Sequence, residues 1–79
     1  MTAISDLKPG KIATVQSVRA LDPSFRQKLL SMGLVPGVEV KVIRRAPFGD
    51  PIQLEVRDYC LCLRAREAKM IDVVIDEKV

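Results

Sequence analysis

The two cysteines are the side chains of this sequence best suited to bind a metal ion or to change redox state. Cys60 and Cys62 lie two positions apart, so a β-strand places both on one face. A disulfide between them is geometrically poor because their Cβ vectors run parallel. A closed zinc site takes four nitrogen or sulfur ligands, and the sequence has two cysteines and no histidine. We therefore expect both cysteines to pack as small apolar side chains on a half-buried strand face. Any metal site would need two copies of the chain.

Catalytic motifs are missing from the sequence. It has no histidine to act as a general base, and none of its serines lies in a G-x-S-x-G motif. It has neither a P-loop nor a G-x-G-x-x-G phosphate-binding loop. Most carboxylates alternate with basic residues, which is typical of solvated strand faces. We expect a protein that is not an enzyme and that holds no cofactor and no metal of its own.

The segment R-R-A-P-F-G-D-P, residues 44–51, is the most unusual part of the sequence. Its prolines, glycine and aspartate predict a surface loop. An aromatic side chain beside arginines has the composition of a binding hot spot, although Phe48 could instead fold back over the core while the arginines pair with nearby carboxylates. A weaker candidate contact is the polar face of a predicted helix. The expected partner-binding residues are Arg44, Arg45, Pro47, Phe48, Asp50, Arg26 and Lys28.

Five short strands are predicted from runs of alternating or β-branched apolar residues. Val18 falls out of phase with Ala13 and Val15, so we expect a bulge near residues 16–17. The inward faces are expected to comprise Val38, Val40 and Val42; Ile52, Leu54 and Val56; and Tyr59, Leu61 and Leu63. The predicted strands are Lys11–Arg19, Val38–Arg44, Ile52–Arg57, Tyr59–Leu63 and Met70–Ile75.

One helix is predicted after the first strand. Asp22 suits its N-cap and Pro23 its first position. Gly33 suits a left-handed residue just past the end, with Leu34 folding back as in a Schellman motif. One apolar stripe is formed by Phe25, Leu29, Leu30 and Met32.

These elements predict a mainly β fold: a small SH3-like antiparallel barrel of about five strands, with one helix after the first strand that closes one end. An OB-like barrel is the alternative. Two Pro-Gly turns, at residues 9–10 and 36–37, introduce strands. Residues 64–69 could form one helical turn, and residues 76–79 are expected to be a solvated tail. With 79 residues, we expect one domain over residues 1–79.

The charge of the chain is mildly basic, with a formal net charge of +3 and a pI of about 9.1. This charge permits attraction to acidic proteins or to nucleic acid. Interleaved acidic residues and only two Phe and one Tyr argue against nucleic acid, which needs a basic stripe and stacking aromatics. No run approaches the about 18–20 apolar residues that cross a bilayer. We expect a cytoplasmic protein that meets membranes only through a partner.

Several segments resemble the FeoA family. The stretch F-R-Q-K-L-L-S-M-G-L-V-P-G, residues 25–37, is similar to the family's basic residue, paired leucines, small residue and G-[LM]-x-P-G. Residues 38–52 resemble the strand and the R-x-A-P-[FL]-G-D-P-[IV] loop that follow it, and residues 61–64 resemble an L-x-L-R strand. The opening L-K-P-G, residues 7–10, is similar as well. The resemblance extends over nearly the whole chain.

The resemblance implies a small SH3-like barrel of the bacterial cytoplasm that supports ferrous iron uptake. Its implied partner is the cytoplasmic GTP-binding domain of FeoB, a membrane permease whose transport or nucleotide turnover it would modulate. We expect Phe48 to enter a pocket of that partner while Arg44 and Arg45 steer toward acidic surface. The alternative is a metal-sensing or nucleic-acid-binding barrel akin to the C-terminal domain of iron-dependent repressors. Self-association to a homo-oligomer is a further expectation.

Overall fold

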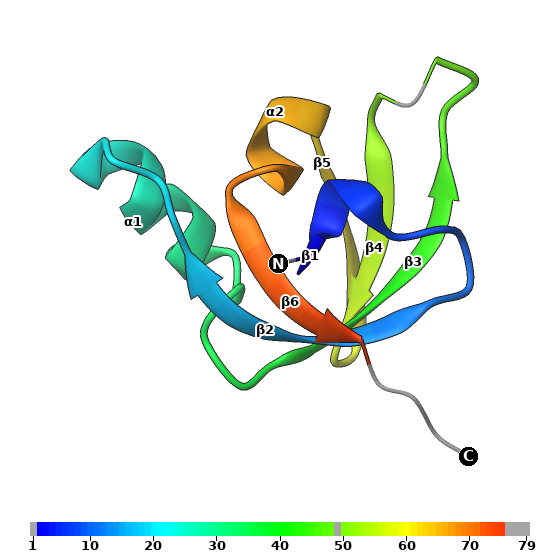
Figure 1. Ribbon diagram of the computed structural model, residues 1–79, viewed down its shortest axis with the longest axis horizontal. Helices are drawn as coiled ribbons and strands as arrows, with labels where there is room; N and C mark the ends of the chain where they lie inside the picture. Colours follow the sequence, from blue (N-terminus) through cyan, green and yellow to red (C-terminus); the bar gives the residue numbers. More distant parts are fainter. Residues whose placement is uncertain (1, 49, 76–79) are drawn as a thin grey trace.

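The computed structural model describes residues 2–48 and 50–75, which form one antiparallel sheet with short helices around it (Figure 1). The strands are β1 (Thr2–Ala3), β2 (Ile12–Val18), β3 (Glu39–Arg45), β4 (Ile52–Val56), β5 (Tyr59–Leu63) and β6 (Ile71–Ile75). The helices are the 3-10 helix η1 (Ile4–Asp6), α1 (Pro23–Ser31) and α2 (Ala65–Ala68). None of these helices is long and apolar enough to span a bilayer.

The strands follow the order β1-β6-β2-β3-β4-β5, and each neighbouring pair is antiparallel. The last strand, β6, therefore lies between β1 and β2, and the sheet bends strongly around the core (Figure 1). The predicted mainly β architecture and the helix after the first long strand are confirmed. The expected five strands become six because β1 was not predicted, and the 3-10 helix η1 was not predicted either. Two paired residues are too few to show an alternating pattern.

Two bulges adjust which residues face the core. The predicted one lies in β2, where the register with β6 shifts between Val15 and Ser17, so that Val15 and Val18 are both buried. A second, unpredicted bulge lies in β3, where the register with β4 shifts between Val42 and Arg44. Ile43 is the extra residue there, and its side chain is 37% exposed. A bulge exchanges the faces of the residues that follow it, which decides where both arginines point.

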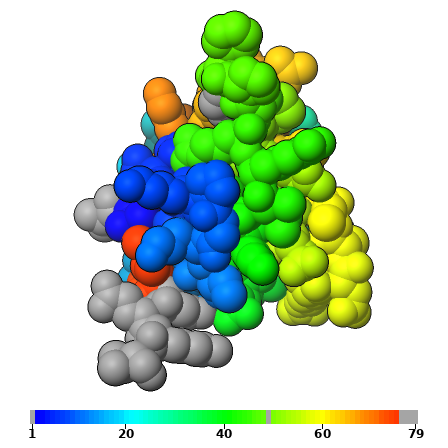
Figure 2. All heavy atoms as spheres, turned by 90° about the vertical axis from the view of Figure 1, so that its right-hand side faces the viewer, coloured from blue at the N-terminus to red at the C-terminus, as the bar shows by residue number. Residues whose placement is uncertain are grey.

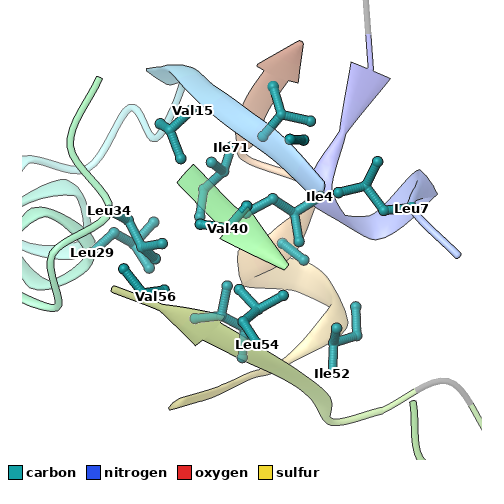
Figure 3. Close-up of a cluster of buried hydrophobic side chains, with 14 of the residues drawn as sticks. Ile4, Leu7, Val15, Leu29, Leu34, Val40, Ile52, Leu54, Val56 and Ile71 are labelled. Atoms are coloured by element: carbon teal, nitrogen blue, oxygen red, sulfur yellow. The ribbon is translucent and has the colours of Figure 1, made fainter. Parts of the chain in front are cut away.

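The core lies inside the bend of the sheet and is completed by residues from outside the strands (Figure 3). Ile4 of η1 and Leu7 after it are buried, although the sequence alone assigned neither residue to the core. Both predicted Pro-Gly turns are present: the Lys11 N–H donates to the Lys8 carbonyl at 3.1 Å and the Val38 N–H to the Val35 carbonyl at 3.1 Å. Leu29 and Leu34 add apolar side chains beside Val56 at one end of the cluster.

The ends of α1 are set by the residues that the sequence indicated. The Asp22 carboxylate accepts a hydrogen bond from the Ser24 N–H at 3.0 Å. At the other end, the Leu34 N–H donates to the Leu29 carbonyl at 3.4 Å and the Gly33 N–H to the Leu30 carbonyl at 3.0 Å. Gly33 has a φ of +93°, so the predicted Schellman motif is confirmed. This motif folds Leu34 back against the core.

The strand β5 is less buried than predicted because it lies at an edge of the sheet. Leu63 is fully buried and Leu61 is half-buried, whereas Tyr59 is 45% exposed. The Tyr59 hydroxyl donates a hydrogen bond to the Met32 carbonyl at the end of α1. Cys60 and Cys62 are exposed, which corrects the expectation of a half-buried second face. The short helical turn predicted in residues 64–69 is confirmed as α2.

Replacing Leu29 with alanine should lower the free energy of unfolding by ~2–5 kcal/mol, because Leu29 is fully buried and its removal leaves a cavity. Leu21→Ala is the matched control, since Leu21 is 98% exposed and should change stability by no more than about 0.5 kcal/mol. Urea unfolding of both variants measures the difference. Equal losses would contradict the packing of α1 on the sheet.

Gly33→Ala should destabilise the protein more than Gly10→Ala. Both glycines have positive φ, where a Cβ atom costs about 1–2 kcal/mol. A Cβ at Gly10 would meet nothing within 4 Å, whereas one at Gly33 would collide with the Tyr59 hydroxyl, so we expect an additional loss of roughly 1–3 kcal/mol. Urea unfolding measures both, and Tyr59→Phe in the Gly33→Ala background should recover part of the additional loss. Equal destabilisation by the two glycine substitutions would refute this contact.

Candidate functional site

The loop between β3 and β4 stands out from one end of the molecule (Figures 1 and 2). Its base is closed by a hydrogen bond from the Ala46 N–H to the Pro51 carbonyl at 3.1 Å. Pro47 is exposed, and Phe48 is 99% exposed. The structure therefore does not adopt the alternative in which Phe48 folds back over the core. Gly49 lies outside the described residues.

Asp50 connects this loop to α2. Its carboxylate accepts a hydrogen bond from the Ala65 N–H, the first residue of α2, at 2.9 Å. The Arg64 N–H, one residue earlier in the chain, donates a hydrogen bond to the Glu67 carboxylate at 2.8 Å. The start of this short helix is thus capped from two directions. The Ala46–Pro51 bond thus holds the base of the loop, and the Ala65–Asp50 bond holds its C-terminal arm. Phe48 projects into solvent.

The neighbouring arginines point to opposite faces of the sheet, as consecutive strand residues do, and the bulge at Ile43 decides which face each one takes. Arg44 is exposed and donates through Nε to the Gln53 side-chain oxygen at 2.9 Å. Arg45 is half-buried and donates to the Leu7 carbonyl at 2.6 Å and also to the carbonyl of Ser5. Arg44 therefore lies in solvent on the outer face, whereas Arg45 ties the N-terminal segment to β3.

A pocket opens at the base of the loop. The pocket lies between the two arginines at the end of β3 and the two prolines of the loop, and it extends to the exposed face of β5. Its lining residues are Arg44, Arg45, Ala46, Pro47, Pro51, Gln53 and Cys62. We call the exposed group Arg44, Pro47 and Phe48 the loop surface. It combines a cation, a rigid proline and an unpacked aromatic ring.

The two helix residues expected to bind a partner are not near this loop. Arg26 and Lys28 are exposed on α1, which lies on the other side of the molecule from the β3–β4 loop (Figure 1). Lys28 pairs with the buried Glu67 carboxylate, with an Nζ to Oε2 distance of 3.3 Å, and so connects α1 to α2. The seven predicted site residues therefore form two separate groups.

A buried acidic residue that sequence reasoning missed lies on β6. Asp72 is 1% exposed and pairs with Arg19, with a distance of 2.9 Å between Arg19 Nε and its carboxylate. Arg19 also donates to the Lys69 carbonyl at 2.8 Å. A buried carboxylate needs such a partner, because an unpaired charge in the interior is strongly destabilising. Asp72 follows a buried isoleucine and precedes a buried valine, so the alternation of β6 indicated that it faced outward.

A second exposed apolar surface was also missed. Leu21 is 98% exposed and lies beside Phe25 and Met70 at the start of α1. An apolar residue before the N-cap usually packs on the fourth helical position, which here is Arg26. That mismatch is the sequence signal that could have identified Leu21 as exposed.

In residues 2–48 and 50–75, no three His, Cys, Asp or Glu side chains come together in a way that could hold a metal ion. Within the same residues, each buried side-chain nitrogen or oxygen has a hydrogen-bond partner. Exposed aromatic and apolar side chains on a rigid frame are typical of protein-binding sites.

Comparison with known proteins gives the same fold and one family. The chain is 43% identical to the FeoA protein of Chlorobium tepidum, whose solution structure it matches over 96% of this chain and 74% of that one with a TM-score of 0.86. It is 30% identical to Stenotrophomonas maltophilia FeoA complexed with zinc, described as a procaryotic SH3 domain protein, with 94% and 91% of the two chains covered and a TM-score of 0.82. The predicted SH3-like fold is thereby confirmed.

A longer relative contains the same domain. The chain is 34% identical over 70 residues to the Fe(2+) transport protein A/Fe(2+) transporter FeoB fusion protein of Porphyromonas gingivalis, which covers 89% of this chain. The chain spans only 8% of the length of that fusion protein. The FeoA domain model matches residues 2–75. The chain therefore belongs to the FeoA family, which takes part in ferrous iron transport.

Proposed function

We propose that this protein is a cytoplasmic, non-enzymatic accessory of ferrous iron uptake that docks on the cytoplasmic GTP-binding domain of a FeoB-type permease. The observation that supports this most directly is Phe48, an aromatic side chain that is 99% exposed on a loop held in place at both ends. The fusion of FeoA and FeoB in one Porphyromonas gingivalis protein supports a partnership between the two.

The hydrogen bonds that hold the ends of the loop favour binding through Phe48. The bond between Ala46 and Pro51 closes the loop, and the bond from Ala65 to Asp50 fastens it to α2. A loop whose ends are held by hydrogen bonds loses less conformational entropy when it binds than one whose ends are free. Aromatic side chains also bury a large area with few rotatable bonds, which makes them frequent anchors of interfaces.

The charged residues near the loop have different roles in this proposal. Arg44 is exposed and contributes to attraction of an acidic partner surface, which acts mainly on the association rate. Arg45 and Asp50 bind main-chain groups of the protein itself, so they define the shape of the loop. Arg26 and Lys28 form a second basic contact on α1, and the Lys28–Glu67 pair holds that helix against α2. We expect the second contact to contribute less than the loop surface.

Phe48→Ala should weaken binding to the FeoB GTP-binding domain by ~1–3 kcal/mol, because it removes the proposed anchor. This corresponds to a rise in Kd of roughly 5- to 150-fold. Leu21→Ala is the matched control, since Leu21 is an equally exposed apolar residue at the other surface. Calorimetry with GDP and with a non-hydrolysable GTP analogue measures both variants and shows which nucleotide state is bound.

Two results would count against the proposal. An unchanged affinity of Phe48→Ala, with thermal unfolding like that of the unsubstituted protein, would exclude the loop surface as the anchor. A loss of binding in Leu21→Ala instead would place the interface at the start of α1. Absence of any binding in either nucleotide state would contradict docking on this domain.

A further inference from the structure

The edge of the sheet at β5 is open. Within residues 2–48 and 50–75, β5 pairs with β4 on one side and with no strand on the other. The atoms of the β4–β5 hairpin lie at the margin of the molecule, in yellow in Figure 2. An open edge presents main-chain N–H and C=O groups that can pair with another strand. The question is which strand fits it.

The direction of these groups follows from the hairpin. Val56 and Tyr59 pair directly on either side of the two-residue turn at 57–58. A pair that closes a two-residue turn exchanges hydrogen bonds, and such pairs then alternate along an antiparallel ladder. The main-chain groups of Tyr59, Leu61 and Leu63 therefore point toward β4. Those of Cys60 and Cys62 point toward the open edge.

The sequence of β5 is self-complementary about its central residue. A second copy of β5, antiparallel and centred on Leu61, places Cys60 opposite the partner's Cys62 and Cys62 opposite the partner's Cys60. Both residues of each pair point their main-chain groups at the other strand, so each pair can exchange its hydrogen bonds. The register therefore satisfies the open edge of both copies at once.

The same register also matches charge. Asp58, the turn residue just before β5, comes three residues before Leu61, and Arg64, just after β5, comes three residues after it, so each Asp58 lies at the same end of the paired strands as the partner's Arg64. Both side chains are exposed, and the backbone at Arg64 is still extended, with a φ of −74° and a ψ of 153°. Two opposite-charge pairs thus flank the cysteines, one at each end. A register shifted by two residues would instead place one cysteine opposite its own counterpart, either Cys60 opposite the partner's Cys60 or Cys62 opposite the partner's Cys62, and would lose the Asp58–Arg64 pairs.

We propose that β5 is a self-association surface whose partner is a second copy of this chain, and that Cys60 forms a disulfide with the partner's Cys62. Hydrogen-bonded antiparallel pairs have a Cα–Cα distance of about 5.5 Å. Disulfides span Cα–Cα distances of about 4.4–6.8 Å. A disulfide between the two cysteines of one chain is geometrically poor along a strand, so the favoured disulfide joins two chains.

The bond forms by thiol–disulfide exchange with a low-molecular-weight disulfide as oxidant. The Cys60 thiolate attacks the oxidant, which releases one thiol and leaves a mixed disulfide. The partner's Cys62 thiolate then attacks the Cys60 sulfur, which forms the interchain bond and releases the second thiol. Each interchain bond thus oxidises two cysteines and reduces one molecule of oxidant to two thiols. The reduced chains associate through hydrogen bonds and charge pairs alone.

Two single-cysteine variants test the register directly. In a dimer of the Cys60→Ser variant, Cys62 lies opposite the serine at the partner's position 60. In a dimer of the Cys62→Ser variant, Cys60 lies opposite the serine at the partner's position 62. With oxidised glutathione, neither variant alone should form a covalent dimer efficiently. An equimolar mixture should form a dimer with one disulfide, and its yield should exceed that of either variant alone at least about tenfold, because only mixed pairs bring Cys60 opposite Cys62. Non-reducing electrophoresis and mass spectrometry measure this yield.

The outcomes distinguish the proposed strand pairing from random collisions between exposed thiols. Cross-linking of each variant alone to the same extent as the mixture would overturn it, since exposed thiols that meet at random have no preferred partner. Absence of a covalent dimer in the mixture would overturn it as well. Far-ultraviolet circular dichroism of each variant checks the fold, which both exposed substitutions should leave intact.

Charge reversal tests the same register without altering a cysteine. Asp58→Arg and Arg64→Asp should each slow formation of the disulfide-linked dimer about tenfold, because like charges then face each other at both ends. The double variant D58R/R64D should recover the original rate, since it exchanges the two charges. Glu39→Lys makes an equally large charge change on β3, which β4 separates from β5, and should leave the rate of disulfide formation unchanged. Failure of the double variant to recover, with its fold intact, would refute the Asp58–Arg64 contact.

Discussion

The pairing of β6 with β1 and β2 is the interaction on which the rest of the structure depends. The last described strand lies between the first two, so that the sheet is complete only when the two ends of the chain meet. This pairing buries Ile71 and Val73 and encloses Asp72, whose charge is balanced by Arg19 on the segment after β2. A chain of 79 residues has a thin margin of stability, so loss of these contacts would destabilise the whole fold. Such distant pairing also closes a long loop, which makes folding slower than for local contacts.

The bulge in β3 sets the orientation of the residues that lead into the β3–β4 loop. With regular alternation, Arg44 would follow Val40 and Val42 onto the core face. The bulge at Ile43 turns Arg44 to the solvent and Arg45 to the inside, where it binds the main chain of the N-terminal segment. The loop that follows is fastened to α2 through Asp50. The position of Phe48 therefore depends on β3, the N-terminal segment and α2, although the loop itself is defined by residues next to Phe48 in sequence.

The two surfaces proposed for interaction differ in their physical character. At the loop, an exposed aromatic side chain has no partner within the described part of the protein, and burial of its ring would drive binding. At β5, the driving groups are main-chain donors and acceptors, and specificity comes from the order of charges and thiols along the strand. Because β4 and β5 form one hairpin, and Cys62 also lines the pocket at the base of the loop, the two surfaces are close together. Association of two copies through β5 would therefore affect access to that pocket.

The sequence alone determined those features whose causes are local. The caps of α1, the Schellman end at Gly33, the Pro-Gly turns and the bulge in β2 follow from residues within a few positions of each other. The surface loop that carries Phe48 followed from its prolines, whereas the sequence left open whether Phe48 is exposed or folds back over the core, and the structure decided that it is exposed. The partner-binding roles of the loop and of α1 stay predictions.

Only the tertiary structure decided which residues meet from distant parts of the chain. β1 is too short to show a pattern and forms because β6 offers it an edge. Asp72 is buried because Arg19 reaches it, and Arg45 turns inward because carbonyls of the N-terminal segment accept its hydrogen bonds. The exposure of both cysteines depends on β5 lying at the end of the strand order. Local propensity carries no information on strand order, since that order is set by which long-range pairings bury the most apolar surface together.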